Sequence, residues 1–184
     1  HFVANLPYDG LYDALTARRV DVVISALVVN PARTADFAYS SVYFDAGEVL
    51  VVRQRDRTVQ SVADLEDHSL AVVLGTQGDR EARDWSRRSE HLSVVQYATP
   101  TGALDALERG ETDAALVDRV SVLEAIGEGM SLAIVGEPVI RVPYAIAMRR
   151  DSQRLLREIN RALAAMREDG TYDQLVTEWL KGEG

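Results

Sequence analysis

The sequence contains no cysteine, a single lysine and no long uninterrupted apolar run. Without cysteine the chain forms no disulfide, carries no thiolate nucleophile and holds no cysteine-ligated metal. The longest apolar stretches, such as VDVVISALVV at residues 20–29, stop well short of the roughly 18 residues that a membrane-spanning helix needs. We therefore expect no membrane span in this chain.

A basic surface is also missing. Acidic residues outnumber basic ones by 29 to 20, and the formal net charge at pH 7 is -9. Nucleic acids and anionic membranes are polyanions that bind to basic faces, so we expect neither as a partner. With 47% hydrophobic and 27% charged residues, the composition is that of a soluble globular protein, and a small molecule or another protein is the expected ligand.

Strand and helix patterns alternate through the first two thirds of the chain. Helical spacing of Leu11, Ala14 and Leu15 separates two short apolar segments, and the apolar run of residues 69–76 is typical of a strand buried on both faces. The segments that we expect to form strands are 2–5, 21–27, 45–54, 69–75, 93–97 and 112–118. Short links between alternating elements predict an α/β fold, with a mostly parallel sheet covered by helices on both faces.

Capping signals mark several helix starts. Ser61 followed by Asp64 resembles a capping box, and a helix is expected to begin after Gly75. Thr99 is a candidate N-cap with Pro100 in the first turn, and Gly110 ends the same helix.

The last third of the chain has a different character. Residues 136–150, GEPVIRVPYAIAMRR, form a proline-bearing extended stretch that suits a crossing segment between two lobes. Two helical patterns follow, at 151–170 and 171–180, and Gly170 separates them.

Four landmarks together carry a family likeness. They are VDVVISALVVNPARTADFAYSSVYFDAGEVLVV at 20–52, DLEDHSLAVVLGTQGD at 64–79, ALERGETDAALVD at 106–118 and INRALAAMREDGTYDQLVTEWL at 159–180. In order and spacing they resemble the family 3 extracellular solute-binding proteins, the polar amino-acid receptors of ABC importers. The resemblance implies a two-lobed periplasmic-binding-protein-like fold (type II), with two crossing strands and a ligand enclosed as the lobes close.

The resemblance also implies lobe boundaries. Lobe 1 would comprise residues 1–46 plus 142–184, and lobe 2 residues 47–141. Family members begin with a strand and a helix that precede the segment resembling HFVANLPYDGL, and lobe 1 is incomplete here without them. Either the sequence shows only part of the chain, or lobe 1 has an unpaired sheet edge.

Arg33 and Asp118 are the principal site candidates. An α-amino acid is a zwitterion, so its receptor offers a cation to the carboxylate and an anion to the amine. The resemblance places Arg33 on the carboxylate, which a planar guanidinium matches with paired donors, and Asp118 on the amine. The alternatives are an exposed surface arginine and an aspartate that caps the following helix; capping is compatible with ligand contact.

Tyr8, Thr76 and Gln77 are further candidates. Tyr8 matches the aromatic wall of the family, although a half-buried aromatic at a helix start is the alternative. Thr76 and Gln77 lie where the backbone amides of a helix N-terminus face a ligand carboxylate.

Three apolar positions bear on ligand specificity, and two of them depart from the family pattern. Val28 replaces a common threonine or serine, and Ala26 replaces a frequent glycine in the same strand. Val73 helps to make the lobe 2 wall apolar. These features favour a ligand with an apolar or modestly polar side chain.

The resemblance implies binding without catalysis, with no cofactor or metal. It implies ABC importer membrane subunits as partners and a periplasmic or extracellular location, with a lipid anchor as an option in the full-length protein. The alternatives are the ligand-sensing domain of a membrane receptor kinase and a cyclohexadienyl-dehydratase-like enzyme. No nucleophile elbow, phosphate loop or zinc pattern is present, and we expect His1, His68 and His91 to be solvated.

Overall fold

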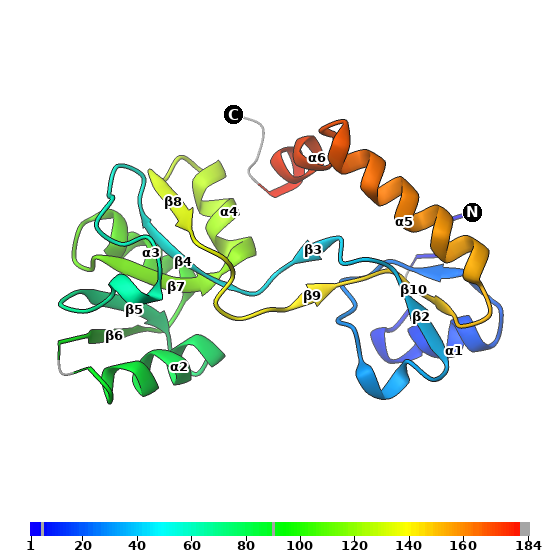
Figure 1. Cartoon of the computed structure of the whole chain (residues 1–184), viewed down its shortest axis with the longest axis horizontal. Coiled ribbons are helices and arrows are strands. Elements are labelled where there is room, and N and C mark those ends of the chain that lie inside the picture. Colours follow the sequence, from blue (N-terminus) through cyan, green and yellow to red (C-terminus); the bar gives the residue numbers. More distant parts are fainter. Residues whose placement is uncertain (5, 90, 181–184) are drawn as a thin grey trace. The chain divides into compact units, whose positions relative to one another are not determined.

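The computed structural model describes residues 1–4, 6–89 and 91–180. The chain divides into two compact units (Figure 1). Unit 1 consists of His1–Asp45 and Pro143–Asp173, and unit 2 of Ala46–Val142 with the chain from Gln174 onward. The lobe boundaries implied by the resemblance stay a prediction.

A five-stranded sheet forms the centre of unit 2. Its strands, in spatial order, are β6 (Ser93–Tyr97), β5 (Ser69–Val73), β7 (Ala114–Asp118), β4 (Glu48–Arg53) and β8 (Leu132–Val135). The β5 strand pairs in parallel with β6 and β7, while β4 runs antiparallel to β7 and β8. Only β4 is reversed within this sheet, which confirms the predicted α/β fold with a mostly parallel sheet.

The helices of unit 2 begin where the capping signals predicted. Thr76 caps α2 (Gln77–Ser86) by accepting the N–H of Asp79, and Thr99 caps α3 (Pro100–Glu108) by accepting the N–H of Gly102. Ser61 and Asp64 form the predicted capping box of the single turn η3 (Val62–Asp64). Asp118 caps α4 (Arg119–Gly127).

Apolar side chains on both faces of this sheet are buried. Along β4, Val49 and Val51 pack with α3 and α4, while Leu50 and Val52 pack on the opposite face with Ala82 of α2. Apolar residues of the predicted strands β5 and β7 are buried, with at most 9% of each exposed: Leu70, Val72, Val73, Ala115 and Leu116. Burial on both faces explains why β5 reads as a continuous apolar run.

Unit 1 is built on a three-stranded antiparallel sheet, in the order β1 (Val22–Val23), β10 (Ala147–Arg149), β2 (Phe37–Tyr39). The helices of unit 1 are η1 (Tyr8–Gly10), α1 (Leu11–Thr16), η2 (Pro31–Arg33) and α5 (Gln153–Glu168). The chain leaves unit 1 for unit 2 within α6 (Thr171–Leu180). The hydrophobic core cluster of unit 1 comprises Leu11, Leu15, Val23, Leu27, Phe37 and Ala147.

The predicted strand at residues 2–5 is wrong for Phe2–Ala4, which have no regular secondary structure; Asn5 lies outside the described residues. In the part of the chain that the structure describes, β1 is an edge strand, with β10 as its neighbour. An extended segment becomes a strand only when it pairs with a neighbour, so apolar sequence alone does not produce one here.

The chain passes between the units after Asp45, after Val142 and again within α6, and short strands flank the first two of these crossings. β3 (Phe44–Asp45) pairs antiparallel with β9 (Pro143–Tyr144). One residue further on, the Ala46 N–H donates to the Val142 carbonyl oxygen at 3.1 Å. Within the predicted extended stretch 136–150, Pro143 lies in β9, whereas residues 136–140, which include Pro138, contain bends and no strand.

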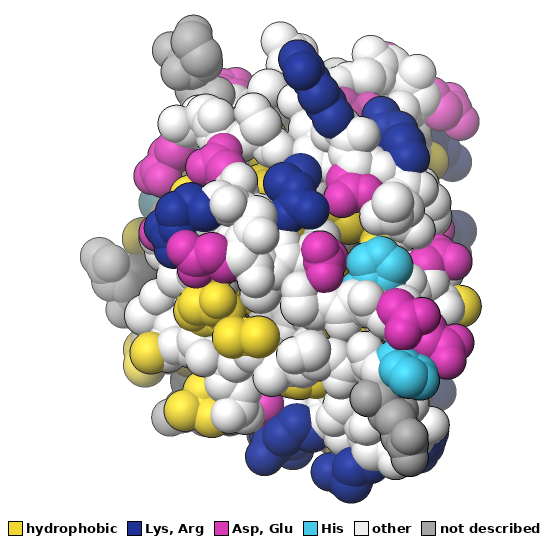
Figure 2. All heavy atoms as spheres, turned by 90° about the vertical axis from the view of Figure 1, so that its left-hand side faces the viewer, with side chains coloured by type: hydrophobic (Ala, Val, Ile, Leu, Met, Phe, Trp, Pro, Cys, Tyr) yellow, Lys and Arg dark blue, Asp and Glu magenta, His cyan; other side chains and the backbone are white. Residues whose placement is uncertain are grey.

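Charges of both signs are interspersed on the surface of unit 2. Figure 2 views it from the left-hand side of Figure 1, and acidic and basic side chains alternate over that face. Such a face offers no concentrated positive field to a polyanion. Within the described ranges, the helices fall short of the length and apolar character that crossing a bilayer requires.

Candidate functional site

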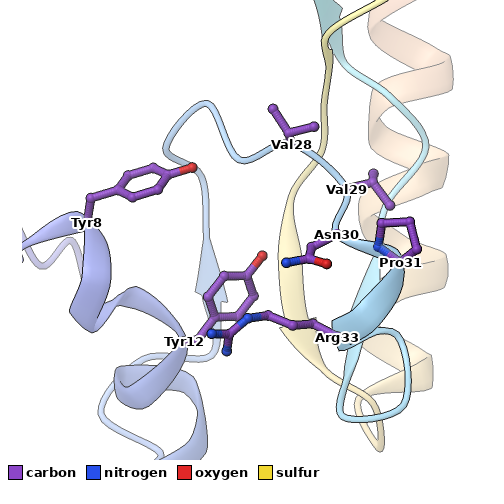
Figure 3. A pocket seen from close by; sticks show the side chains of 7 residues that line it. All are labelled: Tyr8, Tyr12, Val28, Val29, Asn30, Pro31 and Arg33. Atoms are coloured by element: carbon purple, nitrogen blue, oxygen red, sulfur yellow. The ribbon is translucent and has the colours of Figure 1, made fainter.

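A hollow of about 520 Å³ opens on the surface of unit 1 (Figure 3). Its lining consists of Tyr8, Tyr12, Val28, Val29, Asn30, Pro31 and Arg33. The structure therefore brings together three predicted site residues, Arg33, Tyr8 and Val28. Ala26 does not belong to this lining.

Arg33 extends from the single turn η2. Asn30 begins this turn by accepting the Ala32 N–H on its side-chain oxygen at 3.0 Å, and Pro31 occupies the first position. Thr34 closes the turn by donating its hydroxyl to the Pro31 carbonyl oxygen at 2.8 Å. The sequence NPART thus forms a capped turn that fixes the backbone from which Arg33 projects.

The guanidinium of Arg33 stacks on the ring of Tyr12, with 4.4 Å between Cζ and the ring centroid. Figure 3 shows Arg33 reaching from η2 to this ring on α1. The Tyr12 hydroxyl in turn hydrogen-bonds to the Tyr39 hydroxyl at 2.9 Å. Burial, helped by this hydrogen bond, raises the pKa of Tyr12 to about 12, so Tyr12 is neutral at physiological pH.

Ala26 adopts a left-handed backbone conformation with φ of 50°. This region suits glycine, and a Cβ is strained there. The backbone at Ala26 therefore favours glycine, the residue that the family frequently has at this position. The Ala26 N–H donates to the Tyr43 hydroxyl at 3.2 Å, and Val28 forms an isolated bridge with Tyr144.

The other four predicted site residues lie in unit 2. Val73 ends β5, Thr76 and Gln77 follow it at the start of α2, and Asp118 ends β7. Because β5 and β7 are parallel neighbours, these residues share the carboxyl edge of the sheet. That edge is where open α/β sheets bind ligands.

Glu48 occupies the N-terminus of α2. Its carboxylate accepts the Gly78 N–H at 3.0 Å and the Thr76 hydroxyl at 3.4 Å. Burial raises the pKa of Glu48, and nearby Asp118 adds to this effect, against the lowering effect of both hydrogen bonds. A Cβ at Gly78 would collide with the Glu48 carboxylate, so glycine is required for this approach. The predicted ligand contact of this helix N-terminus stays a prediction, and one of its amides is already bonded.

Asp118 is confirmed as a helix cap. One carboxylate oxygen accepts the Ser121 N–H at 2.9 Å, and the other accepts the Ser121 hydroxyl at 2.7 Å. Its predicted contact with a ligand amine stays a prediction.

Sequence reasoning missed Tyr12, Asn30 and Glu48. Asn30 before Pro31 carried a recognisable signal, because asparagine followed by proline favours a capped turn. Tyr12 and Glu48 carried no such sequence signal, because each contacts a residue at least 20 positions away in the sequence.

Histidine and acidic side chains form no metal centre in the described part of the chain, where no group of three or more is placed to hold an ion. His1 and His91 are exposed and His68 is partly exposed. His91 lies 3.5 Å from the carboxylate of Asp67.

Comparison with known proteins gives consistent matches. The model for bacterial extracellular solute-binding proteins, family 3, matches residues 1–182. An ABC transporter glutamine-binding protein of Bacillus subtilis is 28% identical over 162 residues, which cover 88% of this chain and 58% of that protein. The L-cystine-binding protein of Escherichia coli is 30% identical over 176 residues, covering 94% of this chain and 65% of that protein. The chain thus spans less than two thirds of the length of either relative.

Solved structures agree on the fold. An ancestral cyclohexadienyl dehydratase has a TM-score of 0.78 at 24% identity, and the match covers 97% of this chain and 75% of that one. At this identity the likeness establishes the two-lobed α/β fold and carries no activity with it.

Proposed function

Because the chain belongs to the bacterial extracellular solute-binding proteins, family 3, we propose that it is an extracytoplasmic receptor that binds a small amino-acid-like ligand and delivers it to an ABC importer. The observation that carries this proposal is the Arg33 guanidinium, held against Tyr12 at the hollow of unit 1. The names of the glutamine-binding and cystine-binding relatives support an amino acid as the ligand class.

The proposed chemistry separates the two charges of a zwitterion. Arg33 takes the carboxylate, because its planar donors match two carboxylate oxygens. Asp118 takes the ammonium group while continuing to cap α4, since a carboxylate oxygen has more than one lone pair. Thr76 and Gln77 add polar groups beside Asp118.

Apolar groups are proposed to select the ligand side chain. Tyr8 and Val28 line the hollow of unit 1, and 41% of Val28 is exposed and available for contact. In unit 2, Val73 ends the buried strand that leads to Thr76. These surfaces favour an apolar or modestly polar side chain, because a charged one would lose water without gaining a partner.

A ligand screen tests the proposal directly. Thermal unfolding of the purified chain with each proteinogenic amino acid identifies stabilising ligands, because a ligand that binds only the folded state raises the melting temperature. Calorimetric titration then compares the best ligand with the amine that lacks its carboxylate. We expect binding of the amino acid and strong rejection of the amine. Equal binding of the two, or stabilisation by no amino acid, would refute the proposal.

The sensor-domain and enzyme alternatives make different predictions. A sensor domain would be encoded in one reading frame with a membrane helix and a kinase. An enzyme on this fold would convert prephenate or arogenate, which mass spectrometry of the reaction mixture detects. The enzyme alternative rests on fold likeness alone, so we propose binding without turnover.

A further inference from the structure

We propose that Tyr12 is a positioning residue for Arg33: its ring holds the guanidinium in the orientation that receives a ligand carboxylate. This inference rests on the proposed function, because it assigns carboxylate binding to Arg33. Tyr12 itself need not touch the ligand.

The ring of Tyr12 is fixed from two sides. It packs against the ring of Phe37 with 4.8 Å between the centroids, and 6% of Phe37 is exposed. Its hydroxyl is hydrogen-bonded to Tyr39, two residues further along β2. Tyr12 is therefore attached to the sheet of unit 1 through both its ring and its hydroxyl.

Arg33 would be mobile without this support. It is an exposed residue on a one-turn helix, and an arginine side chain has many rotamers to lose when a ligand immobilises it. Stacking on a fixed aromatic ring restricts those rotamers before the ligand arrives. Preorganisation of this kind increases affinity because less ordering remains to be done on binding.

The stacked geometry leaves the binding groups of Arg33 available. All five N–H donors of a guanidinium lie in its plane, so a ring that covers one face leaves the edges free. Both residues line the same hollow, so Arg33 and the space proposed for a carboxylate belong to one site.

The other hollow-lining tyrosine offers a matched control. Tyr8 lies on η1, and 58% of it is exposed. In the proposed site Tyr8 contacts the ligand side chain, so its replacement should weaken all ligands alike. Replacing Tyr12 should instead weaken the recognition of the carboxylate.

The experiment measures discrimination between an amino acid and its decarboxylated amine, by calorimetric titration of wild type, Tyr12→Phe, Tyr12→Leu and Tyr8→Leu. Tyr12→Phe keeps the ring and should keep wild-type discrimination. Tyr12→Leu should lower discrimination by about 3- to 30-fold, the range expected for a lost cation–π contact. Tyr8→Leu should leave the ratio of the affinities for the amino acid and the amine unchanged. In an Arg33→Lys background, Tyr12→Leu should have little further effect.

A ligand-independent measurement keeps the inference testable if no amino acid binds. Protons of the Arg33 guanidinium lie over the Tyr12 ring, so their NMR signals should be shifted upfield in wild type and in Tyr12→Phe, and should return toward ordinary positions in Tyr12→Leu. An unshifted wild-type signal, or unchanged discrimination in a folded Tyr12→Leu protein, overturns the role of Tyr12. Absence of amino-acid binding to wild type, with the upfield shift present, would instead refute the proposed function.

Discussion

Glu48 lies directly opposite Asp118 across the antiparallel pair of β4 and β7. Each carboxylate accepts the backbone N–H of a different helix, Gly78 of α2 for Glu48 and Ser121 of α4 for Asp118. Like charges at opposed positions destabilise a sheet, whereas a negative charge at a helix N-terminus is stabilising. The carboxyl edge of the unit 2 sheet thus carries two neighbouring carboxylates, and each is hydrogen-bonded to the first turn of a helix.

Glu48→Gln should alter the dependence of stability on pH. Burial raises the folded-state pKa of Glu48, so the stability gained from its protonated form is present below the ordinary value of 4.5 and is lost as pH rises through the folded-state pKa. The variant keeps an acceptor for the Gly78 N–H. As pH rises from 4.5 through the folded-state pKa of Glu48, the variant should lose less stability than wild type. Urea unfolding at a series of pH values measures this, with exposed Glu66→Gln as control. Parallel curves for Glu48→Gln and wild type would contradict the expectation.

Arg33→Lys and Asp118→Asn should each weaken ligand binding by about 2 to 5 kcal/mol, because each leaves one ligand charge desolvated and poorly paired. A single ammonium does not reproduce the paired donors of a guanidinium, so lysine should not rescue Arg33. Arg161→Lys on the exposed surface of α5 is the control and should bind as wild type does. Calorimetric titration measures all three. Wild-type affinity in Arg33→Lys would remove Arg33 from the site.

Ala26→Gly should stabilise unit 1 by about 0.5 to 1 kcal/mol. The substitution relieves a left-handed alanine, a gain of about 1 to 2 kcal/mol that the greater freedom of glycine in the unfolded chain partly offsets. Ala38→Gly in β2 is the matched control and should destabilise, because β2 has ordinary extended backbone. Thermal unfolding compares the two, and loss of stability in both would show that Ala26 is not strained.

Asp79→Ala should cost about 2 to 4 kcal/mol, because a fully buried carboxylate disappears and its donors lose their acceptor. Those donors are the Gly75 N–H at 3.0 Å, the Gln96 amide at 2.6 Å and the Arg83 guanidinium at 3.1 Å. Asp84→Ala on the same helix removes a partly exposed carboxylate and should cost far less. Chemical unfolding of both variants gives the comparison, and similar losses would refute the assigned role of Asp79.

Acid should also weaken the Asp79 network. Burial alone would raise the pKa of Asp79, but the hydrogen bonds from Gln96 and Gly75, together with the positive charges of Arg83 and Arg80, outweigh it and lower the pKa. The resulting stability is present above the ordinary pKa of an aspartate and is lost as pH falls through the folded value. Unfolding curves of Asp79→Asn should show a weaker loss in acid than wild type.

Features that depend on neighbours in sequence were predictable. The cap at Thr99 and the capping box at Ser61 follow from side chains that reach the next turn. Burial of Leu70 and Leu116 followed from uninterrupted apolar runs. Arg33 was selected by the resemblance to the family, and the structure places it at the hollow of unit 1.

Features that depend on tertiary pairing were not predictable. Phe2–Ala4 have a strand-like sequence without a strand, since pairing decides the outcome. The stacking of Arg33 on Tyr12 joins residues from separate elements, and the placement of Glu48 at α2 depends on how β4 lies in the sheet. Local pattern carries no information about either contact.

The hydrogen bond between Ala46 and Val142 has a consequence for protein engineering. The two ends of the 46–142 segment are hydrogen-bonded to each other, and the segment contains both apolar clusters that cover its sheet. A segment with adjacent ends and its own core can be excised, rejoined by a short linker or circularly permuted with little loss of chain entropy. Transplanting the segment into a relative at the equivalent point would exchange Asp118, Thr76 and Gln77, the groups of unit 2 that we propose to bind the ligand, while keeping the host's own unit 1 sheet.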